Sequence, residues 1–511
     1  MPAWAFSSPG LWWFLFAITF VGACVSGFCD YIIDDDYINT GIFAIACAIT
    51  LIVLIIGGLT SSKMFNANRY HNIVSISEEN FSEDVPVVSD STPIFIVDMS
   101  TAQHLGDRTI GSIKNATWYE VSNEYNLIKY QGGYYRISAL EYGGLFKYNK
   151  AKHAGIPGYV LVDVTNQEAK YVELEDPIRY SPSGHFSHLL KRHLRNAYPS
   201  YMFGKSYFEI DEEGTPYYIT SVEEPTIGLF GGKTVSKFIL TNAVTGQNKV
   251  YNTDNLPEWV DHAYGLDYLM RITNYNHIYI NGWWNSLFSQ TGVLQTTYQY
   301  KSGSFAGYNT TINSNGDIVF YTGVTPANKS ETNVGFILAN PRTGSINYYT
   351  CAGAEESSAQ NAAESLVQNM GYKATFPTVL NVDGVETYFM LLKDKAGLVQ
   401  RYALCNIKDY TKVVQAETLE EALSLYKKKL LGTGATSSED QTIVGTISNL
   451  YQAEIEGYTY YYFTLEGSTN LYMSSIVNSN KQVLLTVGTK VSITCVSSVE
   501  EGIYIVTKIQ F

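Results

Sequence analysis

The chain has 511 residues, several times the usual length of one domain, so we expect it to fold as several domains. Its formal net charge is −14, with 48 acidic residues against 34 Lys and Arg. Nucleic acid is therefore not expected as a partner, because affinity for a phosphate backbone is built from Lys and Arg. The 41 tyrosines favour strands, and the spacing of the six cysteines indicates neither a disulfide framework nor a CxxC metal pair.

Two uncharged apolar runs lie near the N-terminus. One extends from Leu11 to Phe28 and the other from Ile42 to Leu59. Each has about the 18 to 20 residues that a helix needs to cross a hydrocarbon core of roughly 30 Å. With the acidic connector at 34–36 between them, residues 1–62 are predicted to form a transmembrane helical hairpin in contact with the lipid bilayer. A cleaved signal peptide is disfavoured because no Lys or Arg precedes Lys63.

Two observations disagree about the side of the membrane that carries the rest of the chain. Lys63 and Arg69 follow the second apolar run, and the positive-inside rule would place the region behind them in the cytoplasm. The low charged fraction of 16%, with abundant Tyr, Asn, Thr and Gly, is typical of extracytoplasmic domains of Gram-positive bacteria. We expect a multi-pass protein of the cell membrane with an extracytoplasmic soluble region.

The soluble region divides at changes of composition and at turn residues. Residues 63–93 are polar and predict a linker, and the apolar run 94–98 predicts the first buried strand of a β-rich domain at 94–178. Residues 256–350 predict a second β-rich section, in which the turn at 313–316 joins two strands as a hairpin.

Two further segments share one order of elements, a helix followed by an antiparallel meander. At 179–255 the apolar spacing predicts a helix over 183–196, and at 351–431 it predicts a helix over 357–369. The repeated order predicts an α+β fold with a duplicated module. Both units resemble the small PepSY domain, in which one helix packs on an antiparallel sheet and a strand ends in a Thr-Gly turn, as at Thr245.

A linker composition at 432–440 separates the last domain, residues 441–511, where five short strands are predicted. Five strands in about 70 residues resemble a small barrel of the OB type. The tyrosines at 458, 460, 461, 462 and 472 could supply a stacking face. Acidic residues outnumber basic ones here, so a structural or protein-binding barrel is expected rather than one that binds nucleic acid.

Several stretches resemble an uncharacterised family of membrane-anchored proteins of Gram-positive bacteria. They are KMFNANRY at 63–70, RYSPSGHF at 179–186, FEIDEEGTPYY at 208–218, TIGLFGG at 226–232 and VGFILANPRTG at 334–344. The resemblance covers the chain from Lys63 to about Leu431. It implies membrane anchoring but neither a cofactor nor a catalytic residue.

The sequence GLFGGKT at 228–234 is similar to a phosphate-binding loop, but Ile227 stands where that loop needs its first glycine. The segment also lies between predicted strands, without a helix to present its N-terminus to phosphate. Nucleotide binding is therefore not expected.

Other clusters of reactive side chains have plain structural interpretations. His185, His188 and His193 lack a further ligand nearby and are expected on a solvated basic helix face. Glu355 and Glu356 suit a helix start, Cys405 suits a core strand, and the acidic residues at 211–213 suit an exposed turn. No cofactor or metal site is predicted.

We therefore expect a membrane-anchored binding or scaffold protein of the cell envelope, with an unidentified protein partner and no chemistry of its own. The expected binding surface is aromatic: Trp283, Trp284, Tyr458, Tyr460, Tyr462 and Tyr472. Two alternatives stay open, a PepSY-like modulator of an extracytoplasmic peptidase and an envelope enzyme that acts on glycan or peptide.

Overall fold

The structure is a computed structural model of the chain. It describes residues 2–33, 37–89, 91–112, 116–301, 304–327, 332–431, 441–455, 458–475, 483–497 and 503–510. The fold is mixed α+β, as the sequence predicts, with two apolar N-terminal helices before a strand-rich region. Two compact units are present. Unit 1 is Met1–Glu356 with Phe376–Val379 and Ala396–Leu398, and unit 2 is Ser357–Thr375, Leu380–Lys395 and Val399–Phe511.

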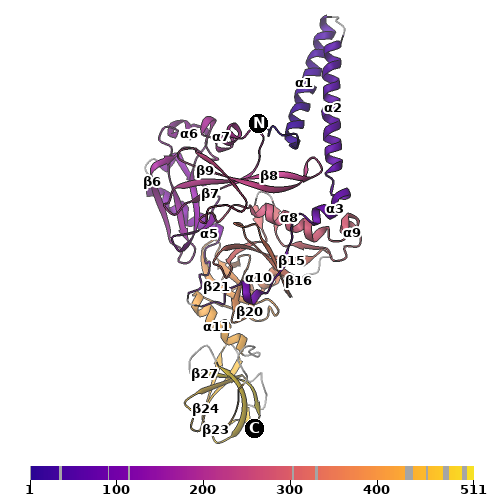
Figure 1. The fold of residues 1–511 in the computed structure, drawn as a ribbon. Coiled ribbons are helices and arrows are strands. Elements are labelled where there is room, and N and C mark those ends of the chain that lie inside the picture. Colours follow the sequence, from indigo (N-terminus) through magenta and orange to yellow (C-terminus); the bar gives the residue numbers. More distant parts are fainter. Residues whose placement is uncertain are drawn as a thin grey trace. The chain divides into compact units, whose positions relative to one another are not determined.

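The two apolar helices are α1 (Pro9–Ile33) and α2 (Ile38–Thr60), which pack against each other as a hairpin (Figure 1). Both are long and apolar enough to cross a membrane, as predicted. At 1.5 Å per residue, 23 to 25 residues span about 35 Å. Only 6% and 11% of their most apolar windows are buried in the protein. The acidic connector at 34–36 lies outside the described residues.

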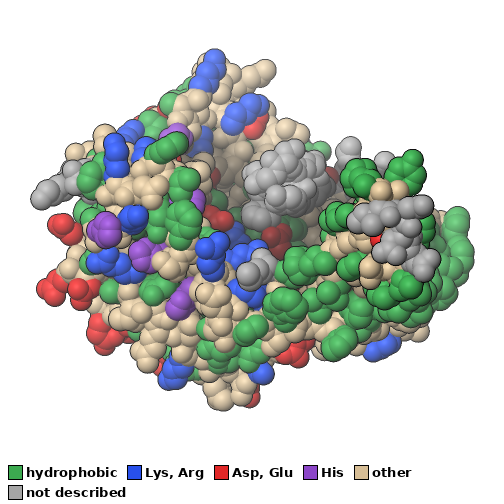
Figure 2. Space-filling model, turned by 90° about the horizontal axis from the view of Figure 1, so that it is seen from above, with side chains coloured by type: hydrophobic (Ala, Val, Ile, Leu, Met, Phe, Trp, Pro, Cys, Tyr) green, Lys and Arg blue, Asp and Glu red, His purple; other side chains and the backbone are tan. Residues whose placement is uncertain are grey.

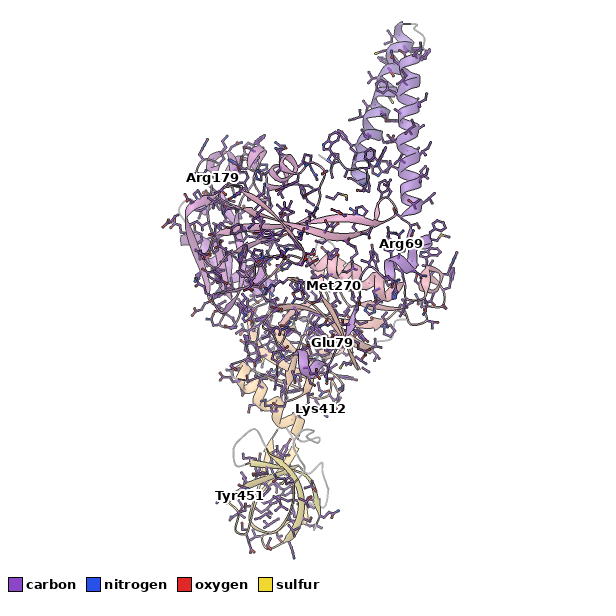
Figure 3. All side chains as sticks on the ribbon, in the orientation of Figure 1. Arg69, Glu79, Arg179, Met270, Lys412 and Tyr451 are labelled. Atoms are coloured by element: carbon purple, nitrogen blue, oxygen red, sulfur yellow. The ribbon has the colours of Figure 1, made fainter. Side chains whose placement is uncertain are left out.

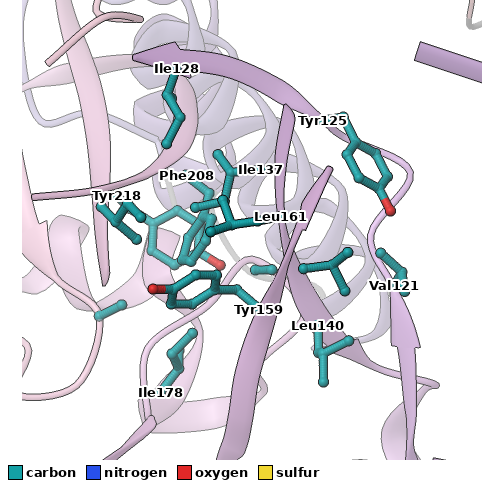
Figure 4. Packing of buried hydrophobic residues seen from close by; sticks show 14 of the residues in the cluster. Val121, Tyr125, Ile128, Ile137, Leu140, Tyr159, Leu161, Ile178, Phe208 and Tyr218 are labelled. Atoms are coloured by element: carbon teal, nitrogen blue, oxygen red, sulfur yellow. The ribbon is translucent and has the colours of Figure 1, made fainter. Parts of the chain in front are cut away.

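The first sheet of unit 1 has the strand order β2-β4-β5-β6, with β3 paired to β4. Its strands are β2 (Tyr119–Val121), β3 (Asn126–Tyr130), β4 (Gly133–Tyr142), β5 (Ile156–Asp163) and β6 (Ala169–Ile178), and its helices are α5 (Met99–Thr109) and α6 (Leu145–Ala151). Tyr159 of this sheet packs on Phe208 of the next sheet, and Phe208 packs on its neighbour Tyr218. Both sheets therefore share one core (Figure 4).

The strand predicted at 94–98 is not formed. Ile96 N donates to the Val164 carbonyl at 2.8 Å, but the Asp98 side chain accepts from Thr101 N at 3.0 Å and so begins α5. The apolar run leads into a helix N-terminus, and Asp98 acts there as the N-cap.

The second sheet is an antiparallel meander of order β10-β9-β8-β7. Its strands are β7 (Met202–Ile210), β8 (Pro216–Ile227), β9 (Gly231–Asn242) and β10 (Asn248–Asn252), preceded by η3 (Phe186–His188) and α7 (Leu190–Ala197). The helix predicted over 183–196 is therefore shorter than expected. Its first half is a 3₁₀ turn, because Ser181 forms a bridge with Leu189 there and holds the backbone extended.

The third sheet has the order β1-β17-β16-β15-β11, with β14 paired to β15. Its strands are β1 (Ser77–Glu78), β11 (Leu294–Thr296), β14 (Asn309–Ile312), β15 (Ile318–Pro326), β16 (Thr332–Ala339) and β17 (Ile346–Ala354); β12 (Gln299–Lys301) and β13 (Ser304–Ala306) pair with each other. Ile312 pairs with Ile318, which confirms the hairpin predicted at 313–316.

Residues 63–93 were predicted to be a linker, but the described residues 63–89 and 91–93 are instead folded into unit 1. They contain α3 (Lys63–His71), β1 and α4 (Phe81–Asp84), and Phe81 and Val85 are buried. The helices α8 (Leu266–Ile278) and α9 (Gly282–Leu287) contact α3. Polar composition alone predicted exposure, whereas Ala67, Tyr70 and Val88 of this segment are buried as well.

Unit 2 contains the sheet β18-β20-β21-β22, in which β19 pairs with β20, and a barrel. The sheet is formed by β18 (Lys373–Ala374), β19 (Thr378–Val382), β20 (Val385–Lys393), β21 (Val399–Asn406) and β22 (Val413–Ala416), with helices α10 (Glu356–Ser365) and α11 (Leu419–Leu431). The closed barrel β23-β24-β25-β27-β26 comprises β23 (Gln441–Ile455), β24 (Tyr458–Leu465), β25 (Leu471–Ser475), β26 (Lys490–Ser497) and β27 (Ile503–Gln510). The linker predicted at 432–440 lies outside the described residues.

Candidate functional site

The end of α2 is fastened to the strand-rich part of unit 1 by a small set of contacts that we call the joint. The joint comprises the last residues of α2, helix α3, and the β8–β9 turn from Ile227 to Gly232. After α2 ends, Ser62 acts as the N-cap of α3, and its side chain accepts from Met64 N at 3.2 Å. The chain therefore passes from α2 directly into the short helix α3, without a flexible linker between them.

Hydrogen bonds across the joint engage main-chain groups on both sides. The buried Tyr70 hydroxyl donates to the Ser61 carbonyl at 2.8 Å and accepts from Gly232 N at 3.2 Å. Phe230 N donates to the Ser61 hydroxyl at 2.8 Å. Burial raises the pKa of Tyr70, so its proton stays in place as a donor.

The guanidinium of Arg69 adds a bond from α3 to the last residues of β8, by donating to the Thr226 carbonyl at 2.8 Å. Figure 3 labels Arg69 at the foot of the hairpin. Arg69 therefore serves as a structural contact at this position, in addition to any effect of its charge on topology.

Glycines allow the β8–β9 turn to approach α2 closely. Gly228 has φ +59°, and a Cβ there would lie 2.5 Å from the Thr60 carbonyl oxygen. On the other side, Gly57 faces the Phe230 ring, which a Cβ would approach to 2.2 Å. The sequence similar to a phosphate loop is thus the turn between β8 and β9, and its Phe230 and Gly232 amides are engaged by the joint.

Beside the joint, α8 and α9 present an aromatic cluster. The Tyr70 ring lies edge-on to Tyr275 with centroids 4.9 Å apart, and Lys63 Nζ lies 4.8 Å from the Tyr275 ring centroid. His71 Nδ1 lies 2.6 Å from the Asn276 carbonyl oxygen, while the Asn276 amide donates to the His71 carbonyl at 3.0 Å. These contacts fix α8 against α3.

Two of the sequence-predicted site residues lie together on α9. Trp283 is half-buried against the cluster around Tyr70, and Trp284 is 59% exposed. The Trp284 ring stacks on Phe288, itself 75% exposed, with centroids 5.7 Å apart. We define the aromatic patch as the exposed side chains of Ile280, Trp284, Leu287 and Phe288.

The predicted tyrosines of the barrel do not form a comparable surface. Tyr472 is 2% exposed and packs with Phe463 inside the barrel, and Tyr460 is 6% exposed in a second cluster with Met473 and Ile505. Tyr462 is half-buried beside that second cluster. The side chain of Tyr458 lies outside the described residues. Tyr472 therefore belongs to the core inside the barrel, and Tyr460 to the second cluster, on the opposite face of the same sheet.

The three histidines near α7 are partly structural. The Tyr148 hydroxyl donates to the His185 carbonyl at 2.8 Å and lies 3.1 Å from His188 Nδ1. The His193 ring packs against Tyr180 in a tilted arrangement with ring centroids 4.3 Å apart, and its Nε2 lies 2.7 Å from the Gly246 carbonyl oxygen. Burial, and then the charge of Arg179, lower the pKa of His188. The rings thus hold α6, η3 and α7 together beneath the lysines and arginines around them.

A buried acidic pair was not predicted from the sequence. Glu209 of β7 is fully buried, and its carboxylate accepts from Asp261 N at 2.9 Å and His262 N at 2.6 Å. Burial raises the pKa of Glu209 and of Asp261. Burial disfavours the charged form of His262 too, and for a histidine this lowers the pKa, to about 3. The sequence clue was an acidic residue between the apolar Phe208 and Ile210, and the bonds indicate that the pair fixes the turn before α8.

A polar pocket of about 200 Å³ lies among Asp84, Asp317, Asn340 and neighbouring polar residues. Its carboxylates already have partners: Asp84 accepts from the Tyr349 hydroxyl at 2.7 Å, and Asp317 pairs with Arg342 at 3.5 Å. Over the part of the chain that the structure describes, no group of three or more His, Cys, Asp or Glu could hold a metal ion.

The remaining acidic motifs are also engaged. Glu356 is buried at the start of α10, accepts from the Tyr321 hydroxyl at 3.0 Å, and has a pKa raised by burial. The Asp211 carboxylate accepts from Glu213 N and Thr215 N, and so closes the turn before β8. Neither arrangement leaves a carboxylate facing an open site.

Comparison with known proteins gives no match: no protein-family model fits the chain, and no curated protein resembles it. Its function is therefore argued from the joint, the aromatic patch and the two apolar helices.

Proposed function

We propose that the chain is a membrane-anchored binding protein, in which α1 and α2 span a bilayer and the strand-rich region engages a protein partner. The observation that carries the proposal is the exposure of the two helices. Only 6% and 11% of their most apolar windows are buried, although the core helix of a soluble protein buries such a surface. Lipid is the environment that would cover this apolar area.

The joint supports anchoring because it makes α2 continuous with the strand-rich region. The hydroxyls of Tyr70 and Ser61 connect the two by hydrogen bonds to main-chain groups, so a membrane-spanning α2 would hold the strand-rich part of unit 1 at a fixed distance from the bilayer. A tether with a loose linker would leave that distance variable.

For the partner we propose the aromatic patch as the contact surface. Aromatic side chains supply large contact area at low entropy cost and dominate many protein interfaces. Trp284 and Phe288 are exposed and stacked, whereas the barrel tyrosines Tyr460 and Tyr472 are buried. The patch is therefore the part of the predicted binding surface that a partner can reach.

Three finer assignments accompany this proposal. The low charged fraction supports an extracytoplasmic strand-rich region, the five strands support an OB type for the barrel, and the quoted sequence stretches support the Gram-positive family. A reporter fused after Phe511 tests the first of them, because its activity depends on the side of the membrane that it reaches.

Anchoring is tested by extraction of membranes from cells that express the full chain. We expect the protein to stay in the pellet at alkaline pH and high salt, and to be released by detergent. Ile49→Arg with Ile52→Arg should abolish this retention, since each charge costs about 3 kcal/mol at the centre of a bilayer. Ile49→Val with Ile52→Val is the matched control. A monodisperse full chain in detergent-free buffer would refute anchoring.

Partner binding is tested by crosslinking in native membranes. We expect a defined crosslinked species that Trp284→Ala with Phe288→Ala reduces at least tenfold. Tyr410→Ala with Tyr451→Ala removes two comparably exposed aromatic side chains from unit 2 and should leave the species unchanged. Equal crosslinking in both variants would exclude the aromatic patch as the contact.

A second proposal is a PepSY-like modulator of an extracytoplasmic peptidase. It is favoured by the order of α7 and the meander β7 to β10, in which β9 ends in the turn at Thr245. Proteolysis of envelope proteins should then change when the chain is deleted, and unchanged proteolysis would exclude this role.

A further inference from the structure

Two short segments of unit 1 carry a concentrated positive charge. Residues 143–155 and 179–200 contain seven Lys and Arg, four of the chain's eight His, and no Asp or Glu. The chain as a whole has a net charge of −14, so these segments oppose the overall balance. We call their exposed side chains the basic face.

The fold brings the two segments together around Tyr148. Tyr148 of α6 contacts His185 and His188 of the second segment, as described above. Arg179 donates to the His153 carbonyl at 2.8 Å, and so ties the start of the second segment to the end of the first. Residues remote in sequence thereby form one continuous surface from α6 to α7.

Three charged side chains of this surface, Lys150, Lys191 and Arg192, are exposed to solvent. Two others have partners within the protein. Arg195 donates to the carbonyls of Pro199 and Tyr201 at the end of α7, and Lys147 pairs with Glu120 at 2.9 Å. In the view from the side of the hairpin, Lys, Arg and His side chains gather on this face (Figure 2).

The basic face lies beside the entry of the chain into α1. Trp4 N donates to the Pro199 carbonyl at 2.9 Å, and Pro199 lies two residues after the end of α7 at Ala197. Trp4 precedes the start of α1 at Pro9 by five residues. In Figure 1, α6, α7 and the N-terminus lie at the end of unit 1 from which the hairpin rises. A bilayer around α1 would therefore approach α7.

Exposed apolar side chains stand among these charges. Phe146 of α6 is 85% exposed, and Leu145 and Phe186 are also exposed. Aromatic side chains among lysines and arginines are the composition of protein surfaces that lie in the headgroup region of a membrane. An acidic protein partner would be matched by the charges but would leave Phe146 and Phe186 unexplained.

We propose that the basic face binds the anionic headgroups of the same bilayer that α1 and α2 cross, with Phe146 and Phe186 dipping into the interface. This inference rests on the proposed membrane anchoring. The ligand proposed for the basic face is an anionic phospholipid. Its negative headgroup attracts the cationic side chains, and each Lys or Arg near such a surface strengthens the contact about fivefold. The strand-rich part of unit 1 would then be held at the membrane in two places, by the joint to α2 and by the basic face to the headgroups.

The test uses the full chain in nanodiscs of phosphatidylcholine alone, or with about one third phosphatidylglycerol. We expect acetylation of Lys150 and Lys191 to slow at least fivefold in the anionic nanodiscs at low salt. Lys395 and Lys490, both exposed in unit 2, are internal controls and should react equally in the two lipids.

Two charge-reversal variants complete the test, with hydrogen exchange of α6 and α7 as the readout. Lys191→Glu with Arg192→Glu should abolish the protection in anionic nanodiscs, and Lys395→Glu with Lys490→Glu should preserve it. Incorporation without any difference between the two lipids would overturn the headgroup contact and leave anchoring intact. Failure of the chain to enter nanodiscs would instead refute anchoring. Protection in native membranes but not in anionic nanodiscs would assign the face to a protein and overturn the lipid proposal.

Discussion

The joint and the basic face both border the hairpin, but they are built from different interactions. The joint uses glycines and hydrogen bonds between main-chain groups and the hydroxyls of Tyr70 and Ser61. The basic face uses exposed Lys150, Lys191 and Arg192 above a scaffold of aromatic rings. Short-range contacts of the first kind define one geometry, whereas solvated charges act over about 8 to 10 Å and weaken with salt.

This difference indicates a division of roles at the proposed membrane surface. The joint fixes where the strand-rich part of unit 1 sits relative to the end of α2. The basic face would then respond to lipid composition without altering that connection. Substitutions in the joint should therefore change stability, and changes of salt or lipid should alter only the basic face.

The largest effect is expected for Gly228→Ala in the joint. The new Cβ would lie 2.5 Å from the Thr60 carbonyl oxygen at a φ of +59°, so the turn must move away from α2. We expect unfolding of unit 1 to become easier by about 2–4 kcal/mol, measured by denaturant titration in detergent micelles.

Gly132→Ala is the control for this substitution. Gly132 also has a positive φ, +82°, but open space around its Cβ position. It should cost only the conformational strain, about 1–2 kcal/mol. Equal losses in the two variants would show that the close approach to Thr60 is unimportant.

A smaller loss is expected for Tyr70→Phe. This change leaves the buried Ser61 carbonyl and the Gly232 amide without their partner, at a cost of about 1–3 kcal/mol. Thermal unfolding of the full chain in detergent reports it. Tyr135→Phe, at a half-buried position in β4, should change stability by less than about 0.5 kcal/mol. An unchanged melting temperature for Tyr70→Phe would show that the Tyr70 hydroxyl does not stabilise the joint.

Salt should separate the two regions more sharply. Raising the ionic strength from about 0.05 to 0.5 M shortens the screening length roughly threefold. Protection of α7 by anionic nanodiscs should fall about tenfold, while exchange in α3 should stay within twofold. Hydrogen exchange in one sample measures both helices. If exchange in α3 and α7 responded equally to salt, the joint and the basic face would not differ in the kind of interaction that holds them.

The smallest effect concerns pH and His188. Burial and Arg179 lower the pKa of His188 below its usual value of about 6.5, so the unfolded state binds the proton more tightly than the folded state. The stabilisation is therefore complete above pH 6.5 and is lost as pH falls below it. Exchange in η3, corrected for intrinsic rates, should rise less than tenfold from pH 7.5 to 5.5.

The variant His188→Gln should remove this pH dependence, and α3 provides the reference within the same sample. An increase of equal size in the variant would assign the pH effect to another group.

Local patterns predicted much of the chain. The apolar runs within α1 and α2 could be recognised because each is long enough to act alone, without help from other segments. The turn at 313–316 follows from nearby residues for the same reason.

Burial could not be predicted in the same way. Tyr460 and Tyr472 were expected on a surface, yet closure of the barrel covers Tyr472, and Tyr460 is buried against Met473 and Ile505. Residues 63–93 have a polar composition, yet Phe81 and Val85 are buried in unit 1. In each case the outcome depends on segments remote in sequence, which a local pattern does not contain.

The sequence by itself determined the two long apolar helices, the uneven distribution of charge and the positions of turn glycines, because these properties depend on a few neighbouring residues. The tertiary structure alone decided that Phe230 meets Ser61, 169 residues away, and that residues 143–155 join residues 179–200 in one basic face. Such meetings follow from the packing of whole sheets. Their free energy comes from burial and hydrogen bonding between distant segments rather than from local propensity.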